Sequence, residues 1–199
     1  MRKIIGYYYG LSSPWTYLGG PRLEAIAQRQ GAAIAYKPCD FAQVFAQSGG
    51  LPVAKRAPQR QAYRLVELER WSRHLDMPLV LQPAHFPTPG ARAGLMVIAA
   101  QKAGPGAGAL SNAIMAALWA ENEDIEDPET LLRAAAGCGL DGDALLVEAG
   151  QAEAAATLQA NTEEAMTRHV FGAPTYAVNE EIFWGQDRLD FVERALAAG

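Results

Sequence analysis

The chain has 199 residues, of which 50% are hydrophobic and 20% are charged, and this composition is typical of a globular protein with enough apolar material for a core. Its formal net charge of −5 argues against nucleic acid or an anionic membrane surface as the main partner. No run of about eighteen apolar residues occurs in the sequence, so we expect no transmembrane helix.

The N-terminal part of the chain predicts a strand, a helix and a second strand, over residues 3–9, 15–30 and 32–37. The helix has clear boundaries, because Ser13 stands at an N-cap, Pro14 stands at the first helical position and Gly31 follows the last turn. Pro38 is expected to stop the second strand. A strand, helix and strand of these lengths indicate a right-handed βαβ unit.

A long helical region follows a loop-like stretch over residues 47–58 and ends near Val170. Apolar side chains recur in it at three- and four-residue steps, and glycines and prolines separate the segments. The predicted helices cover residues 59–75, 91–103, the stretch from the turn at 104–108 to about 121, 128–136, the stretch between Asp141 and Gly150, and 151–169. Asp127 and Asp141 are predicted N-caps, and the acidic run 121–127 is interpreted as a solvated connection.

The last thirty residues predict a return to mixed structure. Two short strands, over residues 176–178 and 181–184, are joined by a turn at Asn179-Glu180. Asp187 is expected to cap a final helix over residues 188–197.

Without its helical region the predicted order of elements is that of a thioredoxin fold. We therefore expect an α/β protein, a thioredoxin-like fold with a large inserted all-helical domain. Residues 1–40 and 161–199 are expected to form the thioredoxin-like domain and residues 41–160 the insertion. Pro174 is the candidate for the cis-proline of such a fold, because an X-Pro bond that enters a strand is a plausible cis peptide.

A thioredoxin-like fold brings together the start of its first helix, the loop before the cis-proline and the turn before the last helix. In this chain those elements are Ser13-Pro14, Ala173-Pro174 and Gln186-Asp187. No cysteine pair stands among them, and the spacing of Cys39 and Cys138 suits no metal site. A disulfide between these two cysteines is one interpretation, and two free thiols in a reducing cytoplasm is the simpler one.

The three elements suit glutathione. The Ser13 hydroxyl can donate a hydrogen bond to a sulfur atom at the positive end of the helix, which would lower the pKa of a bound thiol. The backbone of Ala173 can pair with an extended peptide, and the Asp187 carboxylate can receive an ammonium group. Ser13 taken alone is better interpreted as a simple helix cap, so the prediction depends on the other two elements.

Five segments together resemble the 2-hydroxychromene-2-carboxylate isomerases, relatives of the kappa-class glutathione transferases that carry a helical domain within a thioredoxin fold. The resemblance covers essentially the whole chain, and its segments are Ser13 to Leu18, Ala57 to Trp71 with Arg60, His85-Phe86-Pro87, Gly172 to Thr175, and Phe183 to Arg188. The first and the last of these are the most specific, since the Ala-Pro-Thr sequence is common in thioredoxin-like proteins.

The resemblance implies a role for individual residues. Ser13 would activate the glutathione thiol, Ala173 before the cis-proline Pro174 would bind the peptide backbone, and Gln186 with Asp187 would hold the γ-glutamyl end. A basic residue at the position of Arg60 would contact the ligand. The family works as homodimers with glutathione as cofactor and a small aromatic substrate, and interconverts 2-hydroxychromene-2-carboxylate and trans-o-hydroxybenzylidenepyruvate.

The chain departs from the family pattern at three places. Gly10 and Ser12 replace an acidic and a bulky apolar residue before Ser13, and Gly50 stands where relatives can have asparagine. The presence of Ser12 leaves the choice between two adjacent serines open. The departures bear on the substrate more than on the fold.

Three residues are candidates for binding the substrate, each with an ordinary structural alternative. Lys37 can meet a substrate carboxylate or be a plain strand-end lysine, and His85 can line the substrate pocket or be a structural histidine. Trp15 can form a wall of an aromatic site or belong to the core.

Two other functions use the same features. A glutathione transferase or peroxidase for detoxification would use the same thiolate, and a non-catalytic thioredoxin-like module would bind a peptide or a partner at the Ala173-Pro174 edge.

Overall fold

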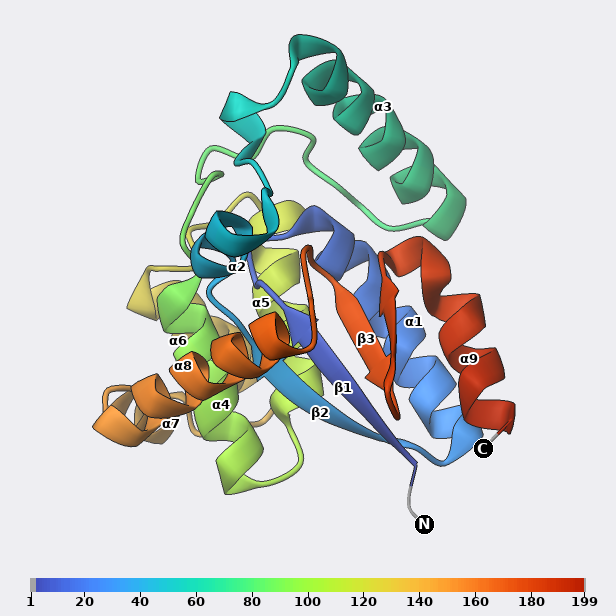
Figure 1. Cartoon of the computed structure of the whole chain (residues 1–199). Helices are drawn as coiled ribbons and strands as arrows, with labels where there is room; N and C mark the ends of the chain where they lie inside the picture. The colour runs from blue at the N-terminus through green and yellow to red at the C-terminus, as the bar shows by residue number, and fades with distance from the viewer. Residues whose placement is uncertain (1–2, 199) are drawn as a thin grey trace.

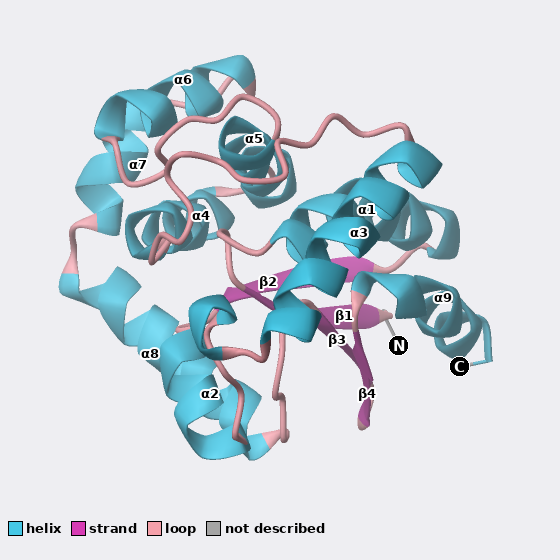
Figure 2. Cartoon of the chain, turned by 90° about the horizontal axis from the view of Figure 1, so that it is seen from above, coloured by secondary structure: helices cyan, strands magenta, loops and turns pink. Residues whose placement is uncertain are grey.

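The computed structural model describes residues 3–198 and is built around one four-stranded sheet (Figures 1 and 2). The strands are β1 (Ile4–Tyr9), β2 (Ala33–Pro38), β3 (Thr175–Val178) and β4 (Glu181–Trp184), in the spatial order β2-β1-β3-β4. β1 is parallel to β2 and antiparallel to β3, and β3 is antiparallel to β4. The parallel pair is the predicted βαβ unit, with helix α1 as its crossover.

The helices are α1 (Pro14–Gln30), α2 (Phe41–Ser48), α3 (Pro58–Leu75), α4 (Ala91–Ala103), α5 (Ala107–Trp119), α6 (Pro128–Gly137), α7 (Gly142–Ala149), α8 (Ala152–Thr167) and α9 (Leu189–Ala198). Helices α2 to α8 lie between β2 and β3 in the sequence. The mixed sheet with helices inserted at this point confirms the predicted α/β class.

Side chains of β1 alternate between two cores, one on each face of the sheet. Tyr7 and Tyr9 belong to the larger core and stack with their ring centroids 4.1 Å apart, while Tyr176 of β3 stacks on Tyr7 at 5.4 Å. Tyr8 points to the smaller core, where it meets Ala165 of α8. Both faces of β1 are therefore covered, which fixes the strand whose end leads into α1.

The predicted helix caps at Ser13, Asp127 and Asp141 are confirmed. Each residue has extended backbone, and its side chain accepts a hydrogen bond from a backbone N–H in the first turn of its helix. Gly31 ends α1 with a φ of 60°, in the left-handed region that favours glycine. The cis peptide bond predicted at Pro174 is also present, and a second one, Phe86-Pro87, was not predicted.

Several local predictions are wrong for identifiable reasons. Strand β2 continues through Pro38, because β2 is an edge strand, where a missing N–H can face away from the partner strand. Helix α2 was missed, although Asp40 caps it by accepting from Ala42 N at 2.8 Å. The acidic run 121–127 is only partly solvated, since Ile125 is fully buried in the larger core.

Asp187 does not cap the last helix. The chain turns at Gly185, whose φ of 103° suits glycine, and forms a 3₁₀ turn over Gln186–Arg188 before α9 begins. Asp187 thus lies inside the first turn rather than before it, and its charge still faces the positive end of the helix.

Within residues 3–198, no helix has the length and hydropathy needed to cross a membrane. In the same part of the chain, no three His, Cys, Asp or Glu side chains are grouped so that they could hold a metal ion.

Candidate functional site

Strand pairing brings three predicted elements to one edge of the sheet, the edge at which β1 and β4 end and β3 begins. Tyr8 near the end of β1 pairs with Thr175, the first residue of β3, and Thr175 pairs with Trp184, the last residue of β4. Gly185 N donates a hydrogen bond to Pro174 O at 2.9 Å. The segments that follow β1, precede β3 and follow β4 are therefore neighbours, and we call this place the site edge.

Ser13 stands at the N-terminus of α1 on the site edge. It is half-buried, its backbone N donates to Gly10 O at 3.1 Å, and its Oγ accepts from Thr16 N at 3.4 Å. An oxygen that accepts in the cap still has its own proton to donate. The unpaired N–H groups of the first turn and the helix dipole make this a favourable position for an anion.

Ser12 is also half-buried and lies against the loop that leads into α4. A Cβ placed on Gly90 would come within 3.4 Å of Ser12 N, and Gly90 has a φ of 65°. The loop thus packs on the backbone of Ser12, next to the cap at Ser13.

Ala173 precedes the cis peptide bond to Pro174. Its side chain is half-buried, and within residues 3–198 its backbone N–H and C=O find no hydrogen-bond partner. The carbonyl just before it is occupied, because Thr175 Oγ1 donates to Gly172 O at 2.7 Å. An unused donor and acceptor on one residue are what an incoming peptide backbone needs.

Gln186 and Asp187 differ in their surroundings. Gln186 is buried against α1, where Arg22 Nη1 donates to its Oε1 at 2.8 Å and Arg22 Nη2 donates to its backbone O at 2.6 Å. A Cβ on Gly19 would lie only 3.0 Å from Gln186 Cβ, so glycine permits this close approach. Asp187 is exposed, and its Oδ2 accepts from Arg188 Nη1 at 2.6 Å. Gln186 therefore anchors the turn, and Asp187 presents a carboxylate to solvent.

Other candidate residues lie at varying places around the edge. Trp15 is half-buried and packs against the larger core, and Arg60 is exposed on the first turn of α3. Lys37 lies on the opposite face of the sheet from Tyr7, where its Nζ pairs with Glu164 of α8 at 2.5 Å and sits 5.7 Å above the Tyr8 ring. Lys37 is thus already engaged with a carboxylate of this chain.

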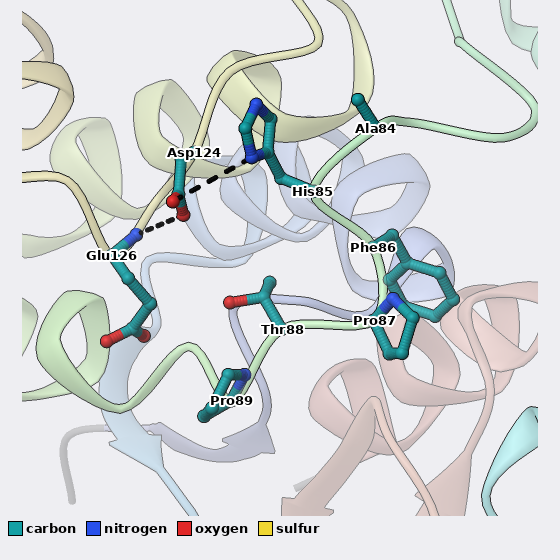
Figure 3. Close-up of a pocket in the computed structure, with 8 residues that line it drawn as sticks. All are labelled: Ala84, His85, Phe86, Pro87, Thr88, Pro89, Asp124 and Glu126. Carbon is teal, nitrogen blue, oxygen red and sulfur yellow. Dashed lines mark hydrogen bonds and ion pairs between the residues drawn. The ribbon is translucent and has the colours of Figure 1, made fainter.

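His85 lines an open pocket of about 430 Å³ formed by residues 84–89 together with Asp124 and Glu126. Figure 3 shows the ring of His85 directed toward Asp124, and the two side chains are 3.8 Å apart at Nδ1 and Oδ2. The pocket wall leads directly to Gly90 and hence to Ser12. His85 is therefore placed at a pocket next to the site edge.

The two cysteines do not have the lowered thiol pKa that is typical of a redox site. Cys39 is buried, and burial raises the pKa of its thiol to about 12, while Cys138 is half-buried and burial raises its pKa as well. Both thiols are free. Neither contributes a reactive thiolate at neutral pH.

Sequence reasoning missed Arg22, which connects α1 to the turn at Gln186. In the sequence, Arg22 stands in the middle of a predicted helix, where a charged residue is expected to face solvent. Nothing in its immediate sequence therefore indicates a long-range contact. The usable signal is the neighbouring pair Gly19-Gly20, because glycines within a helix indicate that another segment packs closely against it.

Comparisons with known proteins identify similar sequences and similar folds. The sequence model of the DSBA-like thioredoxin domain matches residues 4–197. The 2-hydroxychromene-2-carboxylate isomerase of Sphingobium xenophagum is 33% identical over 201 aligned positions, which cover 98% of this chain and 99% of that protein.

Two solved structures extend the comparison. A 2-hydroxychromene-2-carboxylate isomerase superposes with a TM-score of 0.81 at 29% identity, covering 98% of this chain and 95% of the other. The cytosolic disulfide reductase DsbM from Pseudomonas aeruginosa, in a structure with GSH, has a TM-score of 0.69 at 19% identity and covers 98% and 96%. The second likeness shows a shared fold and confirms the expected thioredoxin-like architecture.

Proposed function

Because this chain belongs to the 2-hydroxychromene-2-carboxylate isomerase family of DSBA-like thioredoxin domains, we propose that it is a glutathione-dependent isomerase. Its substrates would be 2-hydroxychromene-2-carboxylate and trans-o-hydroxybenzylidenepyruvate, or a related aromatic 2-oxo acid. The relative from Sphingobium xenophagum, which aligns over 98% of this chain, is named as an isomerase of the first of these compounds.

The observation that supports this proposal is that the segments carrying Ser13 and Ala173 are neighbours at the site edge. Ser13 offers a hydroxyl proton at the start of α1, and Ala173 offers an unpaired backbone N–H and C=O. A tripeptide thiol needs both groups at once, one for its sulfur and one for its backbone. If Ser13 served only as a helix cap, the cis-proline loop with its unpaired backbone groups would have no role beside it.

The residues present fit glutathione in chemistry. Ser13 would donate a hydrogen bond to the sulfur, which together with the helix dipole favours the thiolate over the thiol. Ala173 would pair with the cysteinyl backbone, while Pro174 would keep the loop in its bent form. Asp187, exposed beside the site, would receive the α-amino group, and Gln186 would hold that turn in place through Arg22. Arg60 is proposed to meet a carboxylate of the same ligand.

When bound, glutathione would supply a thiolate able to add reversibly to the conjugated enone of the substrate, so that the carbon–carbon bond could rotate before the thiol is released again. The chain contributes orientation and electrostatic stabilisation of the sulfur. Trp15 and His85 are proposed to line the aromatic side of the site, and Lys37 to assist only if its pair with Glu164 opens.

The test follows the absorbance change of 2-hydroxychromene-2-carboxylate with and without glutathione. We expect turnover only with glutathione, and a glutathione concentration that stays constant through many turnovers. Equal turnover without glutathione would contradict the mechanism. Consumption of glutathione in proportion to product would instead indicate a conjugating transferase.

A thermal-shift measurement distinguishes the proposed isomerase from a non-catalytic binding module. A ligand at 100 times its Kd stabilises the folded state by about 2.7 kcal/mol, so glutathione at millimolar concentration is expected to raise the Tm measurably. An unchanged Tm, with no turnover, would favour the module.

Two further properties are part of the proposal. We expect a homodimer, to be measured by light scattering on the full chain. We also expect a cytoplasmic location, which the two free cysteines support, because a reducing compartment keeps thiols unpaired.

A further inference from the structure

Arg64 of α3 directs its guanidinium group into the protein rather than into solvent. The guanidinium carbon lies 5.1 Å from the centroid of the Phe86 ring and 5.8 Å from the centroid of the Trp119 ring. Phe86 and Trp119 also contact each other, with centroids 5.0 Å apart, and Trp119 is completely buried. The positive charge therefore rests on an aromatic wall.

This charge has no anionic partner in the described part of the chain. Arg64 Nη2 is buried and makes no hydrogen bond, and neither Arg64 nor Arg60 takes part in any ion pair within residues 3–198. Burial, followed by repulsion from Arg56, lowers the pKa of Arg64 to about 10, so the group is still protonated at neutral pH. Arg64 as a whole is half-buried, but a guanidinium nitrogen that is buried without an acceptor is costly, and an anion bound there would reduce that cost.

The location connects Arg64 to the site edge through two contacts. Phe86 lines the pocket of residues 84–89, and that loop continues to Gly90, which packs on Ser12. Farther along α3, the Trp71 ring lies 5.7 Å from the guanidinium carbon of Arg22 on α1. Figure 1 shows α3 lying across the end of the molecule at which α1 begins.

The two carboxylates that line the pocket lie on the same side of it. Figure 3 shows Asp124 and Glu126 on one side of it and Phe86 on the other, and Glu126 Oε1 is buried without a hydrogen-bond partner. Arg64 does not line this pocket but contacts the Phe86 ring, which does. A ligand that lies along Phe86 with a carboxylate at one end is repelled from Asp124 and Glu126 and attracted toward Arg64. Its aromatic part would then lie along Phe86.

We propose that Arg64 binds the carboxylate of an aromatic acid substrate and thereby selects and orients it against the Ser13 end of α1. The guanidinium group is planar and matches a carboxylate with two parallel hydrogen bonds, and the aromatic wall provides the apolar surface. This inference rests on the proposed function for the identity of the substrate. It assigns to Arg64 the role for which Lys37, held by Glu164, was the earlier candidate.

Glutathione also has carboxylates, so the ligand must be identified by experiment. The probe is 2-naphthoate, a bicyclic aromatic acid that has no enone, compared with its neutral carboxamide. Binding to the full-length wild type, Arg64→Met, Arg64→Lys and Arg73→Met is measured by calorimetry, and so is binding of glutathione. Arg73 is the control, because it is an exposed arginine on the same helix paired with Glu69.

The wild type and Arg73→Met are expected to bind the acid about 10- to 100-fold more tightly than the amide, and Arg64→Met is expected to lose that preference. Arg64→Lys should keep part of it, which shows that the site is folded and that the fork geometry matters. All four proteins should bind glutathione equally. In turnover, Arg64→Met should raise KM for the acid more than it lowers kcat.

An undiminished preference for the acid in Arg64→Met overturns the proposal. Weaker glutathione binding with an intact preference also overturns it, since Arg64 would then serve the cofactor. Failure of the proposed function is a separate result: it would appear as absent turnover in the wild type, whereas the acid-over-amide preference is measured without turnover.

Discussion

Arg22 on α1 donates two hydrogen bonds to Gln186, one to the side-chain Oε1 at 2.8 Å and one to the backbone O at 2.6 Å. The pair joins residues 164 positions apart in the chain. It fixes the turn that carries Asp187 to the helix that carries Ser13, so the spacing between the proposed sulfur and amino-group positions depends on this contact.

Replacing Arg22 by methionine should therefore weaken both stability and glutathione binding. The variant loses two partly buried hydrogen bonds donated by the charged guanidinium group. We expect this loss to lower the free energy of unfolding by about 2–4 kcal/mol. Urea unfolding and calorimetric titration with glutathione measure the two effects. The matched control is Arg29→Met, since Arg29 on the same helix forms an exposed pair with Glu193, and its loss should change the stability much less than the loss of Arg22. Unchanged glutathione affinity in Arg22→Met would contradict the role of the contact.

Ser13→Ala should lower kcat by about 10²- to 10³-fold, the loss typical of a removed stabilising donor. The same change also removes the cap of α1, which costs about 1 kcal/mol of stability. Asp127→Ala separates the two effects, because Asp127 caps α6 in the same way and is proposed to have no part in catalysis.

Measured together, Ser13→Ala and Asp127→Ala should show similar losses of Tm but very different losses of kcat. Ser12→Ala identifies which hydroxyl acts. A full rate in Ser13→Ala with a reduced rate in Ser12→Ala would move the assignment to Ser12.

The stability of the smaller core should fall in acid through Glu164. Burial by itself raises the pKa of this carboxyl, but hydrogen bonds from Lys37 and Tyr8 outweigh it and hold the pKa below its usual range. A carboxyl with a lowered folded-state pKa stabilises the protein above its unfolded pKa of about 4.3 and loses that contribution as the pH falls through the folded value.

The Tm difference between wild type and Glu164→Gln should thus be largest at neutral pH and shrink as the pH falls below about 4. Circular dichroism at a series of pH values measures it. Glu163→Gln is the control, because the carboxylate of this exposed neighbour on α8 accepts a hydrogen bond from the neutral Gln159. A difference that is independent of pH would show that the pair contributes no linked protonation.

The two cysteines should be dispensable for isomerisation and differ in reactivity. Burial raises the pKa of Cys39 to about 12, so its thiol should react with iodoacetamide at pH 8 only after unfolding, whereas the half-buried Cys138 should react first. Mass spectrometry of the labelled native chain gives the order. The variant Cys39→Ala/Cys138→Ala should retain glutathione-dependent turnover, and its loss with a native Tm would place a protein thiol in the reaction.

Local sequence signals were sufficient where a single residue decides the backbone. Ser13-Pro14 marked the start of α1, Gly31 its end, and Ala173-Pro174 the cis peptide, because caps, left-handed glycines and X-Pro bonds act within a few residues of themselves. The same signals failed at Asp187, which was the predicted cap of a helix from residue 188. Gly185 instead permits a 3₁₀ turn that begins at Gln186.

The sequence by itself determined the order of the strands and of the helices other than α2, together with the residues that stand at the ends of β1, β3 and β4. The tertiary structure decided which distant charges meet. Arg22 reaches Gln186, Lys37 reaches Glu164, and Arg64 reaches no carboxylate in the described chain. The physical reason is range: backbone preferences act between near neighbours in sequence, whereas the partner of a long charged side chain depends on how whole elements pack.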